Sequence, residues 1–229
     1  MILHHVWKFR VLLVALLALI LVHPLMDDNG LARLCYATVW SLVQIVTIYA
    51  ISAIRWQRRV GLLLGLPMLF AMWGQYAVSE PHGEKYELAV YGVAVVFFTM
   101  VAVMIMRHLV THEVTADNVA GAVCAYLLLG FAVGLFYFII ETLQPHSFEA
   151  SGELAKELTY PIGRRSALTY FSFITLTTAG YGDLTPATPL TRTLASLEAV
   201  LGQFYLAILV AGLVGMRISG RSNNGPTAR

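Results

Sequence analysis

Seven consecutive residues, 177–183, combine two hydroxyl side chains, a Gly-Tyr-Gly turn and a closing acid in the order TTAGYGD. Glycine accepts a positive φ because it has no Cβ atom to clash with the backbone. Alternating such residues with ordinary ones turns successive backbone carbonyls to the same side of the chain. A row of carbonyls repeated around an axis can replace the water shell of a cation. The chemistry that this stretch indicates is therefore cation coordination by backbone oxygen.

The composition of the rest of the chain indicates a membrane protein. Of the 229 residues, 58% are hydrophobic and 12% are charged, whereas soluble domains carry about 25% charged residues. A net charge of +2 gives no support for nucleic-acid binding. Cys35 and Cys124 both lie within apolar stretches, where we expect them to pack as small hydrophobic side chains.

Helices that cross a bilayer need about 20 apolar residues. Six stretches meet this requirement and predict transmembrane helices at about 6–25, 34–54, 60–78, 86–108, 118–141 and 190–216. A shorter apolar stretch, 166–177, predicts a re-entrant helix, and the polar segment before it predicts a loop with one short helix. Lys and Arg concentrate in alternate loops, so both termini are expected to be cytoplasmic and the segment 142–189 to lie outside.

The run TLTTAGYGDLTP resembles the pore signature of potassium channels, which has valine where this chain has Ala179. The surroundings agree, since a long apolar helix precedes the run, the aromatic sequence SALTYFSFITLT leads into it, and a glycine-bearing helix follows. The resemblance covers about residues 118–217. Residues 1–115 resemble only loosely the four helices that precede the pore in six-helix channels.

This resemblance implies an all-α membrane protein with six transmembrane helices, a re-entrant pore helix and a selectivity-filter loop. It divides the chain into a four-helix N-terminal domain (1–115), a pore domain (116–217) and a short, polar, unstructured cytoplasmic tail (218–229). One filter copy cannot enclose an ion, so the expected partners are three further copies of the chain in a cyclic homotetramer. Membrane lipid and potassium ions complete the implied partners, in the plasma membrane and without a cofactor.

The family pattern also implies roles for residues of the filter. Those that would coordinate dehydrated potassium through backbone carbonyls are Thr178, Ala179, Gly180 and Tyr181, with Gly182 completing the filter and the Thr178 hydroxyl forming the innermost site. Those that would support the filter are Thr177, Asp183, Tyr170 and Glu198. In many family members the partner of the acid is a tryptophan, and here Tyr170 is the candidate donor to Asp183.

The last helix carries the candidates for an inner-helix hinge and for the water-filled cavity below the filter: Gly202, Gln203, Leu206 and Val210. Gly202 falls where the family places its hinge, and close helix packing is the alternative. The other three residues are spaced to share one helical face. For Gln203, an interhelical hydrogen bond is the alternative to facing the cavity.

Glu198 is an acid deep within an apolar span, which makes it a functional hypothesis by default. It lies five residues before Gln203, about 140° around the helix, so the two side chains are not expected to share a face. We expect Glu198 to meet the pore helix near Ser172 or Thr175. It would there support the filter or make a purely structural hydrogen bond.

The sequence therefore predicts a potassium-selective channel subunit that conducts passively, and not an enzyme. The fourth span has no basic residue between Lys85 and Arg107, so strong voltage gating is not expected. Ala179 and the missing tryptophan leave open a poorly conducting or regulatory channel-like subunit. A polytopic membrane enzyme is a more remote alternative, and its candidate cluster would be His108, His112, Glu113 and Asp117, which we interpret as solvated loop residues.

Overall fold

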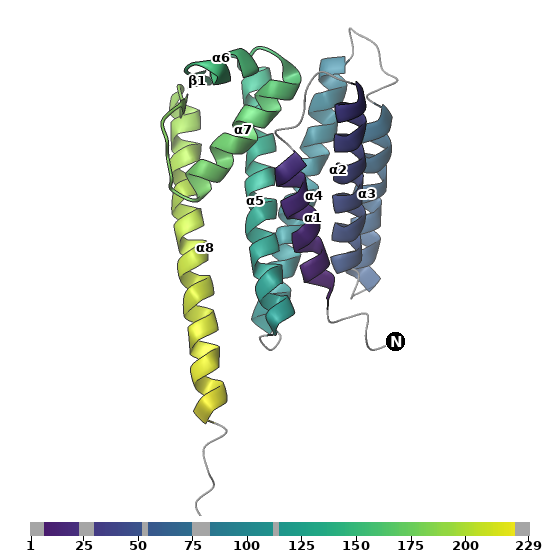
Figure 1. Cartoon of the computed structure of the whole chain (residues 1–229), viewed down its shortest axis with the longest axis vertical. Helices are drawn as coiled ribbons and strands as arrows, with labels where there is room; N and C mark the ends of the chain where they lie inside the picture. The colour runs from purple at the N-terminus through teal and green to yellow at the C-terminus, as the bar shows by residue number, and fades with distance from the viewer. Residues whose placement is uncertain (1–6, 23–29, 52–54, 75–82, 112–114, 223–229) are drawn as a thin grey trace, which may run out of the picture.

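The computed structural model describes residues 7–22, 30–51, 55–74, 83–111 and 115–222, which fold mainly into helices (Figure 1). The N-terminal group consists of α1 (Lys8–Val22), α2 (Gly30–Ile51), α3 (Arg55–Gly74) and α4 (Gly83–Thr111). The C-terminal group consists of α5 (Ala116–Leu143), α6 (Glu153–Glu157), α7 (Pro161–Leu176) and α8 (Pro189–Ser222). A helix is thus present at each of the six predicted spans and at the predicted re-entrant segment.

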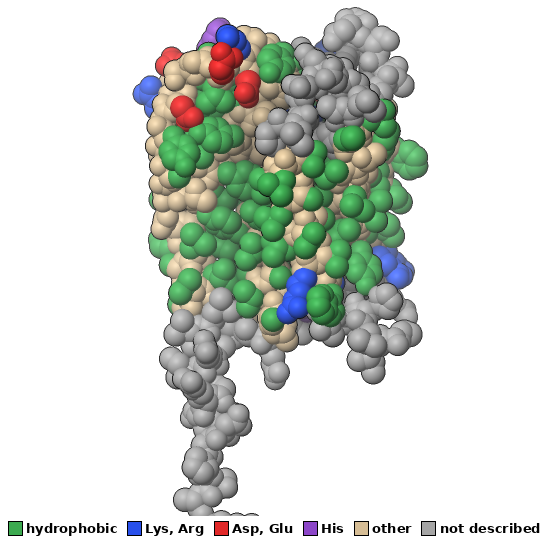
Figure 2. All heavy atoms as spheres, viewed as in Figure 1, with side chains coloured by type: hydrophobic (Ala, Val, Ile, Leu, Met, Phe, Trp, Pro, Cys, Tyr) green, Lys and Arg blue, Asp and Glu red, His purple; other side chains and the backbone are tan. Residues whose placement is uncertain are grey.

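Three helices in the described ranges are long and apolar enough to cross a membrane: Lys85–Leu109, Ala116–Leu143 and Pro189–Gly212. A shorter apolar stretch, Ala37–Ile51, lies within α2. The chain is therefore a helical membrane protein, and the number of six spans stays a prediction. Hydrophobic side chains cover the middle of the visible surface, and acidic ones gather at the end that carries α6 and β1 (Figure 2).

Helix α5 joins the two groups, because it packs against both α4 and α7. Trp40 of α2 lies edge-on to Phe98 of α4 and to Phe131 of α5, with ring centroids 5.4 and 6.1 Å apart. Such T-shaped aromatic pairs add about 0.5–1.5 kcal/mol beyond the area they bury. The N-terminal helices α2 and α4 therefore share a hydrophobic core with α5 of the C-terminal group.

Asp117 fixes the start of α1 against the start of α5. Its carboxylate is buried and accepts the backbone N–H of Arg10 at 3.1 Å, which satisfies one of the unpaired amides at a helix N-terminus. The interpretation of Asp117 as a solvated loop residue was therefore wrong. His108 lies in the last turn of α4 with its ring 5.9 Å from that of Phe9, while His112 and Glu113 fall outside the described residues.

Two glycines allow α7 to lie close to α5. A Cβ atom at Gly130 would come within 2.5 Å of the Phe173 ring, and one at Gly134 within 2.7 Å of the Thr169 backbone. Ser172 of α7 also donates a hydrogen bond to the Gly130 carbonyl at 2.8 Å. The small-xxx-small spacing of α5 therefore serves packing against the pore helix.

The segment between α5 and α7 contains the predicted short helix, α6, and also a strand that the sequence did not predict. β1 (Phe148–Ala150) pairs antiparallel with β2 (Leu184–Pro186), which follows the filter, with Phe148 opposite Pro186. The predicted tail also differs, because α8 continues to Ser222. Gly220 in this extension costs about 1 kcal/mol of helix stability relative to alanine, yet the helix continues past it.

Candidate functional site

The backbone of the filter segment alternates in conformation. φ is +58° at Thr178, +51° at Gly180 and +79° at Gly182, whereas the residues between them have no positive φ. The two glycines follow the alternation expected from their type. Thr178 was not anticipated in this conformation, since β-branched residues rarely adopt it.

The amides of the filter point back to the end of the pore helix. The N–H of residue 178 donates to the Thr175 carbonyl at 2.9 Å, and those of residues 179 and 180 donate to the Ile174 carbonyl at 2.8 and 3.2 Å. Across a trans peptide, a carbonyl points opposite to the N–H of the next residue. The carbonyls of residues 177–179 are therefore turned away from α7, toward the open side of the segment.

That open side has no covering within the described chain, because residues 177–182 are all exposed. The Tyr181 side chain is 73% exposed. The exit of the filter is fixed more firmly, since the β1–β2 pairing follows it and the backbone N–H of Ser151 donates to the Asp183 carbonyl at 3.1 Å. A single chain thus supplies one wall of a carbonyl-lined path and leaves the facing side open.

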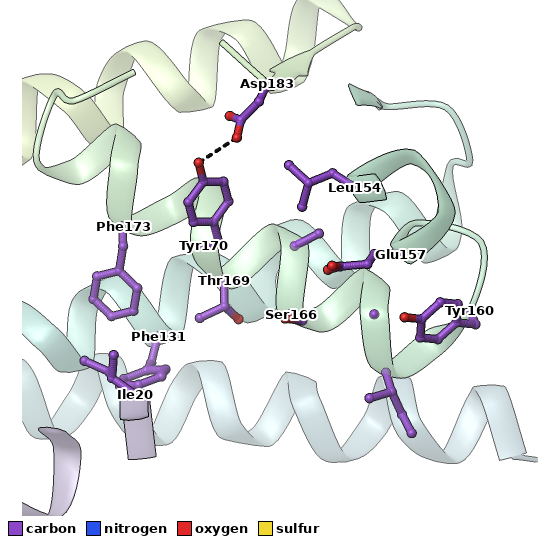
Figure 3. Close-up of a pocket in the computed structure, with 13 residues that line it drawn as sticks. Ile20, Phe131, Leu154, Glu157, Tyr160, Ser166, Thr169, Tyr170, Phe173 and Asp183 are labelled. Atoms are coloured by element: carbon purple, nitrogen blue, oxygen red, sulfur yellow. Dashed lines mark hydrogen bonds between the residues drawn. The ribbon is translucent and has the colours of Figure 1, made fainter. Parts of the chain in front are cut away.

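Asp183 and Tyr170 lie against each other at the filter exit. The Tyr170 hydroxyl donates to the Asp183 carboxylate at 2.7 Å (Figure 3). The pair lies in the wall of a pocket of about 820 Å³ formed largely by α6 and α7. The structure thus joins the acid to the donor that stands in place of the family's tryptophan, and the hydrogen bond links the pore helix to the residue directly after the Gly-Tyr-Gly turn.

Glu198 joins three helices behind the filter. Its carboxyl group is 2.5 Å from the Ser172 hydroxyl of α7 and accepts the Tyr137 hydroxyl of α5 at 2.8 Å. The side chain is only 4% exposed. Sequence reasoning placed Glu198 near Ser172 but did not identify Tyr137. A buried tyrosine in the middle of an apolar helix was the available signal, because its hydroxyl needs a partner.

One arrangement of protons that satisfies all the hydrogen bonds around Ser172 has a proton on Glu198. Ser172 has a single hydroxyl proton, yet its oxygen lies within hydrogen-bond distance of both the Gly130 carbonyl and Glu198. If Ser172 donates to Gly130, a protonated Glu198 can donate to Ser172 while its other oxygen accepts from Tyr137. Every polar atom of this group is then satisfied without a buried charge.

Glu198→Gln is expected to retain the folded assembly, and Glu198→Ala to destabilise it. Like a protonated carboxyl group, the amide can donate from one side and accept on the other, whereas alanine leaves the Tyr137 hydroxyl buried without its partner, at a cost of about 1–3 kcal/mol. The thermal midpoint of the purified protein and its potassium flux would be measured for both variants. Equal losses in the two variants would show that the negative charge of Glu198 is required.

Gly202 lies against the end of the pore helix. A Cβ atom there would overlap the carbonyl oxygen of Leu176 and lie 2.9 Å from its carbonyl carbon. The Tyr126 hydroxyl of α5 donates to the same Leu176 oxygen at 2.9 Å. α8 is continuous through this position, so close packing, one of the two roles considered for Gly202, is present in the structure.

Gln203 makes a direct contact with the filter. Its side-chain amide donates to the Thr178 hydroxyl at 2.8 Å. Leu206 and Val210, the other two cavity candidates, are 38% and 58% exposed. The structure therefore links Gln203 to the innermost residue of the filter segment, and the expectation that the three residues line a cavity stays a prediction.

The similarity to a known protein family lies in the segment of the chain that contains this site. Residues 126–217 match a family described as an ion channel. Over 89 residues the chain is 34% identical to two pore potassium channel c of Oryza sativa subsp. japonica, an alignment that covers 39% of this chain and 17% of the relative. The chain thus spans a small part of the length of that relative. No solved structure matches the chain.

The alternating filter backbone, the pore helix against which it folds and these matches define an ion channel and not an enzyme. Residues 126–217 match the ion channel family, and part of the chain is similar to a potassium channel, which supports the resemblance seen in the sequence over this segment.

Proposed function

We propose that four copies of this chain assemble into a potassium-selective channel in the cell membrane. The observation that carries the proposal is the alternating backbone of residues 178–182, together with the amides of residues 178–180, which bond back to α7 and so turn the carbonyls of residues 177–179 toward the open side. Potassium and rubidium would shed water for these oxygens at several weak sites, and repulsion between neighbouring ions would move them along. The bound ions would contact Thr178, Ala179, Gly180 and Tyr181, and the filter needs no other cofactor.

The exposed surface of α8 supports assembly with further copies. Large apolar side chains are uncovered along this helix in the single chain, among them Leu197, Leu201, Phe204 and Ile208. In the proposed assembly, a neighbouring copy would cover these side chains together with the exposed filter segment and Tyr181. Four filter strands around an axis would then complete the ion path. Asp183 with Tyr170, and Glu198 with its partners, would hold the filter against the pore helix.

The proposed orientation places both termini in the cytoplasm. The start of α1 and the end of α8 lie at the same end of the molecule, opposite α6 and β1 (Figure 1). Basic residues at the start of α3, Arg58 and Arg59, are exposed, as the positive-inside tendency requires. Residues 1–115 would form a collar of four helices, followed by the pore domain 116–217 and the tail 218–229.

Purified protein in planar bilayers tests the proposal under bi-ionic conditions. Reversal potentials are expected to show potassium and rubidium permeating far better than sodium. The same recordings, taken from about −100 to +100 mV, are expected to show little change in open probability, because steep gating needs about 3–4 charges per subunit and α4 has no basic residue between Lys85 and Arg107.

Equal permeability to sodium and potassium would refute the selectivity. A steep conductance–voltage curve with gating current would refute the voltage insensitivity. A tetramer that carries no potassium flux would favour the poorly conducting or regulatory subunit.

A further inference from the structure

The contact between Gln203 and Thr178 assigns a role to a side chain of the inner helix that the filter motif does not include. The two residues are 25 positions apart, and the amide Nε2 of Gln203 lies 2.8 Å from the hydroxyl Oγ1 of Thr178. Thr178 is the first residue of the positive-φ alternation. Its hydroxyl is therefore the first filter oxygen that a cation would meet on the α8 side.

A threonine hydroxyl has one proton and two lone pairs, and it rotates to suit its surroundings. The Gln203 amide is a donor at this contact, so it occupies one lone pair of Oγ1 and limits that rotation. The second lone pair stays available to a cation. Without the amide, the hydroxyl could turn its proton toward the ion path, where a positive ion would repel it.

Both side chains are exposed in the single chain, so the contact lies outside the packed core of the subunit, on the surface that would face the ion path in the proposed tetramer. Gly202 keeps this geometry in place, because the adjoining turn of α8 packs directly on the Leu176 carbonyl at the end of α7. The hydrogen bond thus connects two backbones whose relative position is already fixed by packing.

We propose that Gln203 is a positioning residue that orients the Thr178 hydroxyl and so sets the affinity of the innermost cation site. The inference rests on the proposed potassium channel function and deepens it. It concerns how strongly a dehydrated cation binds at the inner end of the filter. It leaves the carbonyl sites of residues 179–181, and with them the preference for potassium over sodium, largely unchanged.

Block by Ba²⁺ tests this proposal, because Ba²⁺ has nearly the radius of potassium and twice its charge. The full-length channel is recorded in planar bilayers with Ba²⁺ added on the side of the C-terminal end of α8. Gln203→Met removes the donor but keeps a long unbranched side chain. It is expected to weaken block by about tenfold across the four subunits, with the reversal potential for potassium against sodium unchanged.

Two comparisons separate orientation of the hydroxyl from a general change in polarity. Ser196→Ala removes an exposed polar side chain of α8 whose hydroxyl donates to the Arg192 carbonyl of the same helix. Ba²⁺ should block this variant as strongly as it blocks the wild type. Gln203→Met combined with Leu206→Gln restores the amide one turn further along the same face. It is expected to remain as weakly blocked as Gln203→Met alone.

Wild-type block in Gln203→Met, or recovery of wild-type block in the double variant, would overturn the proposal. If Gln203→Met does not assemble, Gln203→Glu provides the second test. A carboxylate accepts a hydrogen bond from the Thr178 hydroxyl, which leaves both lone pairs of Oγ1 available to the ion. Block should then become tighter, and unchanged block would overturn the proposal. A wild-type protein without potassium current would instead contradict the channel function itself.

Discussion

Gly180→Ala is expected to abolish potassium conduction while the subunit still folds. Gly180 has a φ of +51°, and a Cβ atom there would meet no atom of the chain within 4 Å, so the penalty is conformational rather than a collision. An L-residue in this region costs about 1–2 kcal/mol. Over four subunits, a cost of about 4 kcal/mol or more corresponds to a roughly thousandfold lower population of the conducting backbone.

The matched control for this variant is Gly152→Ala. Gly152 also has a positive φ, +64°, with no atom within 4 Å of an added Cβ, but it lies in the loop before α6 and contributes no carbonyl to the proposed filter. It should lose stability and retain selective conduction. Single-channel recording and assembly state would be measured for both variants. A conducting, selective Gly180→Ala channel would refute the proposal that a row of backbone carbonyls in the filter segment lines the ion path.

Ala179→Val provides a comparison within the filter itself. Ala179 has no positive φ, so valine adds volume behind the carbonyls without backbone strain. We expect selectivity to be kept and open times to lengthen, because the larger side chain packs more tightly behind the filter. This variant therefore separates the size of a filter side chain from the handedness of the filter backbone.

Gly202→Ala is expected to destabilise the protein and reduce its conduction. The new methyl group would overlap the Leu176 carbonyl, and a backbone atom cannot move aside as a flexible side chain can. Overpacking of this kind costs about 1–3 kcal/mol per site. Because Leu176 directly precedes the filter, displacing α8 also displaces the support on which the filter amides fold.

Gly92→Ala is the control, since Gly92 lies within α4 and an added Cβ would meet no atom within 4 Å. Alanine should there stabilise the helix by up to about 1 kcal/mol, so the two glycine variants should shift the thermal midpoint in opposite directions. If Gly202→Ala kept its midpoint but lost open probability, the hinge role would be the better account.

Much of the fold follows from local pattern. The apolar stretches identified six helices and a shorter pore helix, because a membrane helix satisfies its own backbone and needs only a continuous apolar run. The run from Thr177 to Asp183 predicted the filter segment, because glycine at positions 180 and 182 permits the positive φ that the structure has there. The partnership of Tyr170 with Asp183 followed from the resemblance to the family pattern.

Contacts between residues far apart in the sequence were harder to predict. Tyr137 lies 61 residues from Glu198, and β1 pairs with a strand that follows the filter. Neither pairing has a periodicity that a single sequence reveals. Asp117 was interpreted as solvated because it follows a polar loop, and only the packing of α1 against α5 shows that it caps a helix.

The sequence by itself determined the class of protein and the positions of the helices and predicted the filter residues, through its composition and its resemblance to a known pore signature. Only the tertiary structure decided which side chains contact the filter segment and its pore helix. Glu198 could have paired with several residues of the pore helix, and Gln203 could have faced water alone. Their partners depend on how α5, α7 and α8 cross, which is set by small residues such as Gly130 and Gly202 where backbones touch. That depth of approach is a property of two surfaces together, so neither helix sequence contains it alone.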